Sequence, residues 1–289
     1  MGRRVQARRL SCFWERNERP SGKPARRSIW ELSNHPYAAG STELESGYGC
    51  RCGIVRSGAP TETEKALTTE PHLIARNLHR AFKIGARRIE VLRGISLEIR
   101  RGEAIFLCGA SGAGKTTLLY TLAGLERPES GEVTFEGHRL YRNGSSADAR
   151  IRNERMGFVF QSYFLLPELT ALENVVLPSL IRQRQQQERA VEYLERVGLK
   201  DRLHHLPSEL SGGEQQRTAI ARALINDPAI IFADEPTGNL DTANGDAIMD
   251  LLLALAREKQ KTLVVVTHDQ ERALAGDRCL HIRDGLLTD

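Results

Sequence analysis

The chain has 289 residues, of which 40% are hydrophobic and 27% are charged. This composition is that of an ordinary globular protein with one large domain or two small ones. No run of about 18 apolar residues occurs, because the best candidate, residues 104–125, is interrupted by glycines and Lys115. The sequence therefore argues against a membrane-spanning helix, and the few scattered cysteines argue against a disulfide framework. We expect any membrane contact to run through a partner.

The basic residues are concentrated in the first thirty positions. These positions hold nine Lys or Arg and two Glu, so the net charge of this segment alone is larger than the net charge of +4 of the whole chain. The remainder is therefore net acidic, and the charge does not indicate a nucleic-acid surface. No apolar stretch of a secretory signal follows the basic start. We expect a cytoplasmic protein without a nucleic-acid partner.

Residues 1–70 are rich in Arg, Ser, Gly, Pro, Glu and Thr and lack a sustained apolar period. This composition predicts a disordered basic extension. Cys50 and Cys52 could form half of a zinc site, but no second Cys or His pair lies at zinc spacing, so we do not interpret them as metal ligands.

From residue 71 to residue 289 the pattern becomes one of strands and helices separated by Gly and Pro. Continuous apolar runs indicate parallel strands covered on both faces, and an alternating run indicates a half-exposed strand. The prediction is an α/β domain with a helical insertion at about 145–225. The predicted strands are residues 95–100, 104–108, 131–135, 157–160, 230–233 and 263–267, and the predicted helices are residues 115–125, the region of 190–197 and a helix after Thr242.

A phosphate-binding loop lies between the second of these strands and the first helix. Its glycines let backbone N–H groups turn toward phosphates, and the helix N-terminus adds a partial positive charge. Lys115 is expected to reach the β- and γ-phosphates of ATP, and the Thr116 hydroxyl is expected to ligate Mg²⁺. The loop consists of Gly109, Ala110, Ser111, Gly112, Ala113, Gly114, Lys115, Thr116 and Thr117.

Two acidic residues end the apolar strand at 230–233. Asp234 is placed to hold Mg²⁺, and Glu235 projects beyond it as a general base for the attacking water. Together with the phosphate loop, these acids predict a nucleotide hydrolase.

The segment Ser211-Gly212-Gly213-Glu214 is typical of a helix start with a capping box. Its two glycines leave the first backbone N–H groups unobstructed, so this helix end is suited to bind an anion.

The order of phosphate loop, Ser211 segment and acidic strand resembles that of the ABC ATPases, and the resemblance covers residues 72–289. It implies a P-loop NTPase of ABC ATPase type, with an antiparallel β subdomain and a helical subdomain at about 145–225. In that family two chains close head to tail. Ser211, Gly212 and Gly213 would therefore face the ATP held by the opposite subunit, with Ser211 and Gly213 on its γ-phosphate, and activity would require a homodimer.

The resemblance also assigns roles to single residues. Gln161 would sense Mg²⁺ and the attacking water and link to the membrane partner. His268 would hold the γ-phosphate and position Glu235, while Asp241 would act across the dimer. Phe82 stands where the family usually has a tyrosine that stacks on adenine.

Residues 164–175, 206–210 and 236–241 are similar to those of LolD-type lipoprotein-release and MacB-like export ATPases. This similarity implies an ATP-hydrolysing subunit at the cytoplasmic face of the inner membrane, working with two separate permease chains. The alternative is an FtsE-like regulatory module that signals through a membrane partner without transport. Chromosome-maintenance ATPases are disfavoured because no sustained heptads separate Lys115 from Ser211, and translation factors because only one set of motifs is present.

Overall fold

The computed structural model describes residues 71–142 and 144–288. The interpretations of residues 1–70 as a disordered extension and of Cys50 and Cys52 as non-ligands lie outside the described residues.

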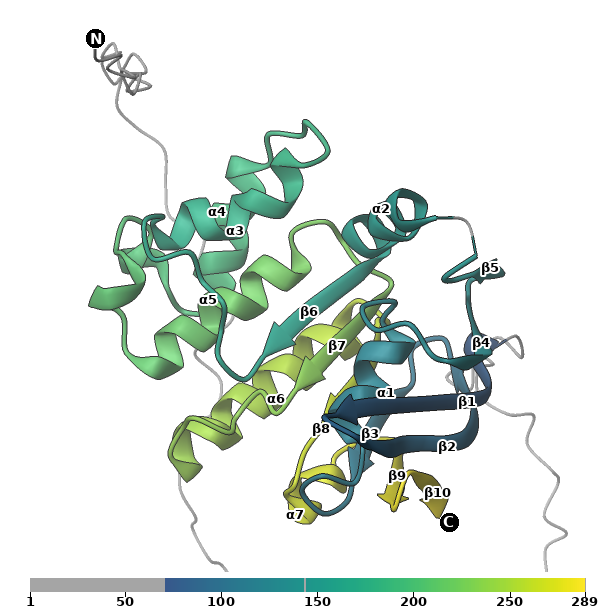
Figure 1. Ribbon diagram of the computed structural model, residues 1–289. Helices are drawn as coiled ribbons and strands as arrows, with labels where there is room; N and C mark the ends of the chain where they lie inside the picture. The colour runs from purple at the N-terminus through teal and green to yellow at the C-terminus, as the bar shows by residue number, and fades with distance from the viewer. Residues whose placement is uncertain (1–70, 143, 289) are drawn as a thin grey trace, which may run out of the picture. The chain divides into compact units, whose positions relative to one another are not determined.

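Two β-sheets form the scaffold of the domain (Figure 1). The antiparallel sheet has the order β2-β1-β4-β5 and consists of β1 (Pro71–Ile84), β2 (Arg87–Arg100), β4 (Ser130–Phe135) and β5 (His138–Arg139). The second sheet has the order β10-β9-β3-β8-β7-β6 and consists of β3 (Ala104–Cys108), β6 (Met156–Phe160), β7 (Ile230–Asp234), β8 (Thr262–Val266), β9 (Arg278–Arg283) and β10 (Leu286–Thr288). In this sheet only β10 runs antiparallel to its neighbour. The expected mixed α/β fold with an antiparallel β subdomain is confirmed.

The helices lie around the six-stranded sheet, and α3, α4 and α5 pack against one another beside β6 (Figure 1). The helices are α1 (Lys115–Leu122), α2 (Ser145–Arg155), α3 (Ala171–Leu180), α4 (Gln187–Arg196), α5 (Gly212–Leu224), α6 (Thr242–Glu258) and α7 (Gln270–Ala273), with 3₁₀ turns η1 (Lys200–Arg202) and η2 (Pro207–Glu209). Among the described residues, no helix combines the length and apolar character needed to span a bilayer.

The region expected to be a helical insertion, about 145–225, contains α2 to α5 but is not helical throughout. Strand β6 lies inside it and pairs with β7 as the edge of the six-stranded sheet. The apolar residues Met156 and Val159 are buried there, and this burial favours a strand in the sheet over a continuation of α2. The helical part is therefore split by one strand of the central sheet.

The six-stranded sheet separates two hydrophobic cores. Successive side chains of a strand point to opposite faces, so each buried strand contributes alternately to both cores. In β7, Ile231 and Ala233 belong to the core beneath α3 to α6, whereas Ile230 and Phe232 belong to the core shared with α1 and the antiparallel sheet. This arrangement confirms the predicted central strands covered on both faces.

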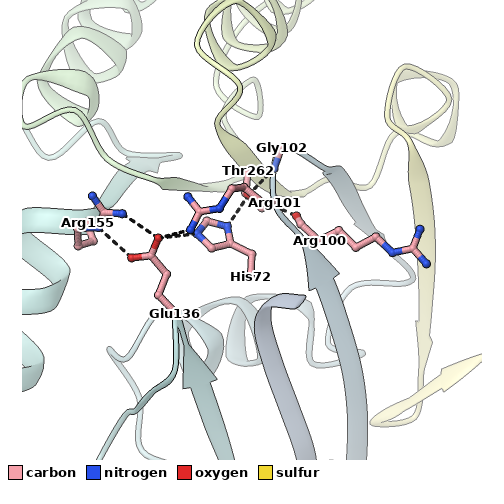
Figure 2. Close-up of polar contacts among 7 residues, drawn as sticks. All are labelled: His72, Arg100, Arg101, Gly102, Glu136, Arg155 and Thr262. Carbon is pink, nitrogen blue, oxygen red and sulfur yellow. Dashed lines mark hydrogen bonds and ion pairs between the residues drawn. The ribbon is translucent and has the colours of Figure 1, made fainter. Parts of the chain in front are cut away.

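A polar cluster with His72 and Thr262 buried at its centre and two exposed arginines at its edge joins the two sheets (Figure 2). His72 of β1 contacts Thr262 of β8 through Nδ1 at 2.6 Å and Glu136 through Nε2 at 3.3 Å. Arg101 and Arg155 donate to the carboxylate of Glu136 at 2.6 and 2.7 Å. Burial opposes the ionisation of Glu136, but the hydrogen bonds from the two arginines outweigh it and hold its pKa at about 2. The charged network therefore fixes β1 and the end of β4 against β8.

Candidate functional site

The phosphate loop connects β3 to α1, and its backbone path requires glycine at two positions. Gly114 caps α1 with a φ of 102°, and a Cβ there would lie 2.8 Å from the carbonyl oxygen of Val91. A Cβ on Gly109 would overlap the carbonyl oxygen of Ile282 in β9. The loop is therefore held between β2 on one side and β9 on the other.

The loop surrounds a cavity of about 310 Å³. The Nζ of Lys115 is buried beneath the loop and donates to the carbonyl oxygens of Gly109 and Ala110, each at 2.9 Å. The flexible stem of Lys115 lets this ammonium turn toward a phosphate in the cavity. The lining residues are Val91, Ser111, Gly112, Gly114, Lys115, Thr116, Thr117 and Glu235. The structure thus brings six of the predicted loop residues and Glu235 to one cavity, whereas Gly109, Ala110 and Ala113 do not line it.

Thr116, which lines the cavity, contacts Asp234 at the end of β7. The Thr116 hydroxyl donates to Oδ1 of Asp234 at 2.9 Å, which joins the first turn of α1 to the end of β7. Burial raises the pKa of Asp234 above its ordinary value, although the hydrogen bond from Thr116 acts in the opposite direction. The protein therefore presents a buried carboxylate whose negative charge a nearby cation would stabilise.

Glu235 leaves β7 with a left-handed backbone, at a φ of 43°. Its N–H still donates to the carbonyl oxygen of Val266 in β8 at 3.0 Å, while its side chain lines the cavity. The Nδ1 of His268 lies 3.5 Å from Oε2 of Glu235. Each of these residues directly follows a parallel strand of the sheet or lies two residues beyond one, so the sheet register sets their separation.

Gln161 also reaches this edge of the sheet. Its backbone carbonyl accepts from Nδ2 of Asn239 at 2.9 Å, and its Nε2 donates to Oδ1 of Asn239 at 3.4 Å. A Cβ built on Gly238 would lie 2.8 Å from Nε2 of Gln161 and 3.3 Å from Oε2 of Glu235. Gln161 and Glu235 therefore converge on the backbone of Gly238.

Asp241 lies next along this segment and caps α6. Its Oδ1 accepts from the backbone N–H of Asn244 at 3.0 Å, and hydrogen bonds to Asn244 lower the pKa of its carboxyl. Asp241 is exposed to solvent and thus remains open to a partner chain.

Ser211 caps α5 with the predicted capping box. Its Oγ accepts from the N–H of Glu214 at 3.3 Å, and its own N–H donates to the Glu214 carboxylate at 2.8 Å. Hydrogen bonds to the carboxylate from the backbone N–H and the side chain of Ser211, with a contribution from Arg202, hold the pKa of Glu214 at about 2. None of Ser211, Gly212 and Gly213 lines the cavity of the phosphate loop. The structure therefore does not bring these glycines to the loop of the same chain.

Phe82 is a partly exposed residue of β1 and also does not line the loop cavity. It pairs with Ile89 of β2, two residues before the lining residue Val91. The guanidinium of Arg80 lies over its ring, 4.7 Å from the centroid. The ring is not part of either hydrophobic core and lies on the sheet surface, with Arg80 covering one of its faces.

The motif analysis missed Arg222 of α5. Its guanidinium donates to the backbone carbonyl oxygens of Tyr163, at 2.6 Å, and of Phe164, in the segment that follows Gln161. Burial lowers the pKa of Arg222 to about 10. Tyr163 and Phe164 both have positive φ, so the guanidinium stabilises an unusual backbone turn. The only signal in the sequence is one arginine within the apolar stretch of α5.

A groove of about 380 Å³ lies beside this turn, between α2, β6, α3 and α5. Phe164 lines it and is 62% exposed, and the following Leu166 is 43% exposed. Asn174 of α3 braces the segment, because its side chain bonds the backbone N–H and carbonyl of Leu166 and the carbonyls of Leu169 and Thr170. Exposed apolar side chains on a braced loop are typical of a surface that binds another protein.

The comparisons with known proteins agree with this geometry. The sequence profile described as ABC transporter matches residues 92–238. The chain belongs to the ABC transporter family. It is 50% identical over 221 residues to the lipoprotein-releasing system ATP-binding protein LolD of Myxococcus xanthus, covering 75% of this chain and 98% of the relative. It is 49% identical over 216 residues to the uncharacterized ABC transporter ATP-binding protein YbbA of Escherichia coli, covering 74% and 95%.

Solved structures show the same cassette. The dimeric, post-hydrolysis structure of the ATP-binding cassette MJ0796 bound to ADP and Pi has a TM-score of 0.71 and 40% identity, covering 75% of this chain and 97% of that one. The predicted ABC ATPase fold is therefore confirmed, and the chain is an ATP-binding and ATP-hydrolysing subunit of an ABC transporter. The FtsE-like alternative without transport is not favoured.

Proposed function

We propose that this ATPase subunit works as a homodimer with two permease chains to release lipoproteins from the cytoplasmic membrane, bound peripherally at its cytoplasmic face. The homodimer is supported by one observation: the cavity formed by the phosphate loop and Glu235 is not lined by Ser211, Gly212 or Gly213 of the same chain. A second chain would supply them. The names of relatives support the substrate class, since LolD proteins of Myxococcus xanthus and Porphyromonas gingivalis share 50% and 48% identity with this chain.

The chemistry rests on three residues around the cavity. Lys115 turns from its two carbonyl partners to the phosphates of ATP. Glu235 accepts a proton from the attacking water as the new bond to the γ-phosphorus forms and the bond to ADP breaks. His268, 3.5 Å from Glu235, orients this carboxylate and contacts the γ-phosphate.

The donor set at Thr116 and Asp234 fits a magnesium ion. Mg²⁺ prefers hard oxygen ligands, and a hydroxyl and a buried carboxylate with a raised pKa lie 2.9 Å apart here. Thr116 and Asp234 would hold the ion, with Gln161 as a further ligand. The bound ion would neutralise charge on the phosphate oxygens.

Two further contacts belong to this proposal. Phe82 offers its ring to the adenine base from the sheet surface beside Val91. The exposed Asp241 acts across the dimer, next to the ATP shared by the two subunits.

Mixing two inactive variants tests the head-to-tail dimer. Lys115→Ala removes the phosphate contact of one chain, and Ser211→Arg blocks the segment that its partner offers. Each variant alone is expected to be inactive, while mixed dimers are expected to regain at most one working site. Normal hydrolysis by the Ser211→Arg homodimer would contradict the shared site.

The proposed contact of the permease is the surface formed by the groove that Phe164 lines and by Leu166, which lies outside the groove two residues further along the same exposed segment. Leu166→Asp is expected to leave the ATPase of the isolated subunit intact and to abolish co-purification with the permease. The matched control is Leu286→Asp, because Leu286 is 46% exposed but lies on β10 at the opposite edge of the sheet. If both variants lose the permease equally, or if circular dichroism shows that Leu166→Asp is unfolded, the assignment of the groove fails.

Reconstitution tests the substrate. Proteoliposomes containing the permease, this subunit and a lipid-anchored lipoprotein are expected to release the lipoprotein only with ATP, and not with the Glu235→Gln subunit. If the permease stimulates hydrolysis while the lipoprotein stays in the membrane, the lipoprotein-release proposal is wrong and MacB-like export or FtsE-like signalling remains.

A further inference from the structure

Two thiols lie at the base of the phosphate loop. Cys108 is the last residue of β3 and directly precedes Gly109, and Cys279 lies on the neighbouring strand β9. Their Sγ atoms are 2.9 Å apart. A disulfide bond is about 2.05 Å long, so the sulfurs need to approach by only about 0.9 Å to bond. Within the described part of the chain, these two are the free cysteines.

We propose that Cys108 and Cys279 form a reversible disulfide when the protein meets hydrogen peroxide, and that this bond slows ATP hydrolysis by shifting the start of the phosphate loop. This proposal goes beyond the proposed function. The disulfide can form whether or not the protein releases lipoproteins.

The two thiols differ in access. Cys108 is 1% exposed, whereas Cys279 is only partly buried, so peroxide reaches Cys279 first. The Nε2 of His281 lies 3.7 Å from the Sγ of Cys279 and can take the thiol proton when that nitrogen is unprotonated. Burial raises the pKa of Cys108 to about 12, so Cys108 stays a neutral thiol, and the 2.9 Å separation of the two sulfurs is what favours its reaction with an oxidised Cys279.

The reaction has two steps. The Cys279 thiolate attacks one oxygen of peroxide, the O–O bond breaks, and the departing hydroxide takes a proton as water, leaving a sulfenic acid. The Sγ of Cys108 then attacks the Sγ of Cys279, the S–S bond forms, and the S–O bond breaks. The Cys108 proton leaves with the hydroxyl as a second water. Two electrons pass from the thiols to peroxide, and a dithiol reductant reverses the change.

The bond would act on the first residue of the loop, because Gly109 lies directly against β9, whereas the tip of the loop faces an open pocket beside β9 and β10. The backbone of Gly109 already lies against the carbonyl of Ile282 in β9. Gly109 and Ala110 also supply the two carbonyls that receive the Lys115 ammonium. A shift of Cys108 toward β9 therefore displaces the carbonyls that position Lys115.

The test uses the full chain, treated with hydrogen peroxide and then with an alkylating agent that blocks free thiols. Digestion without reductant and mass spectrometry are expected to give a peptide that links Cys108 to Cys279. ATP hydrolysis is expected to fall about tenfold or more, since a misplacement of about 1 Å costs up to about a hundredfold. Dithiothreitol should restore it. Untreated hydrolysis, measured in parallel, reports on the ATPase independently of this proposal.

Two variants separate this site from other oxidation. Cys279→Ser is expected to keep its activity after peroxide, and the triple variant Cys12→Ser, Cys50→Ser and Cys52→Ser is expected to lose activity as the natural chain does. The proposal is overturned if no linked peptide forms, if the linked protein hydrolyses ATP at the untreated rate, or if Cys279→Ser is equally sensitive.

Discussion

The hydroxyl of Thr116 donates a 2.9 Å hydrogen bond to Oδ1 of Asp234, so the first turn of α1 and the end of β7 share one polar contact inside the nucleotide site. The contact brings together a hydroxyl and a carboxylate from segments that are far apart in the chain. Both groups could therefore bind the same metal ion.

Asp234→Asn keeps the shape of the side chain and removes this charge. We expect the Mg²⁺ concentration for half-maximal ATP hydrolysis to rise about tenfold or more, because a neutral amide is a weaker ligand for a hard cation. Hydrolysis measured over a magnesium titration checks this expectation. The control is Asp246→Asn, since Asp246 is an exposed residue of α6 that pairs with Arg272. An unchanged magnesium requirement in Asp234→Asn would remove Asp234 from the metal site.

Glu235→Gln is expected to bind ATP nearly as well as the natural chain and to lower turnover by about 10²- to 10⁴-fold, the usual contribution of a positioned general base. The reason is that its carboxylate faces the cavity from a left-handed turn that packing holds in place. Measuring nucleotide affinity and single-turnover hydrolysis on the same preparation checks the expected affinity and the expected loss of turnover. Turnover within a few-fold of the natural chain would show that another group accepts the proton.

Arg222→Met removes two hydrogen bonds from a partly buried charged donor to the turn after Gln161. We expect a loss of about 2 to 4 kcal/mol in the free energy of unfolding, since charged hydrogen bonds contribute about 1.5 to 3 kcal/mol each and are not fully additive. Arg150→Met, which breaks an exposed i,i+4 ion pair with Glu154, should cost less than about 0.5 kcal/mol. Urea denaturation compares the two. Equal losses would mean that Arg222 does not stabilise the turn.

The sheet junction makes the folded state sensitive to acid. Burial and the charge of Arg101 lower the pKa of His72 below 6.5, against the opposing effect of Glu136. As the pH falls, the unfolded chain therefore takes up a proton on His72 before the folded chain does. The contribution of neutral His72 to the free energy of unfolding is thus complete above about pH 6.5 and decreases below that pH. The ionised Glu136 adds a second loss between about pH 4.5 and pH 2.

We therefore expect the melting temperature of the natural chain to drop between pH 7.5 and pH 5.5, and the drop to shrink in His72→Gln. Calorimetry at both pH values measures it. His138→Gln is the matched control, because His138 is exposed on β5. If His72→Gln and the natural chain show the same drop, another group is responsible.

The sequence predicted the buried strands and the half-exposed β4 within one or two residues, but it missed β1, β5, β9 and β10 and found only the last part of β2. The apolar run at 104–108 matches β3, and the runs at 230–233 and 263–267 match β7 and β8 within one residue, because a strand covered on both faces must be apolar throughout. The helix predicted to reach 125 ends at Leu122, since Gly124 takes a φ of 71° after it. Strand β9 was missed because its burial pattern is mixed.

For the site, motifs located every residue whose side chain meets the phosphate cavity except Val91, which gives no local signal. Arg222 could not be predicted either, because its partners are backbone carbonyls of a turn distant in sequence. The relation of Ser211 to the phosphate loop was inferred only from the family resemblance, since one chain holds the two apart. Local patterns thus identify the chemical groups, while their mutual positions depend on long-range packing.

The contact between Gly109 and Ile282 has a consequence for biosynthesis. The phosphate loop is among the first parts of the domain to leave the ribosome, but the strand that supports it, β9, is made near the end. Nascent chains that stop before β9 keep the loop sequence without its supporting surface. Because contacts between distant segments form last, nucleotide binding should appear abruptly when residues 278–283 emerge rather than gradually as the chain grows. Only subunits whose synthesis has passed β9 would therefore bind ATP.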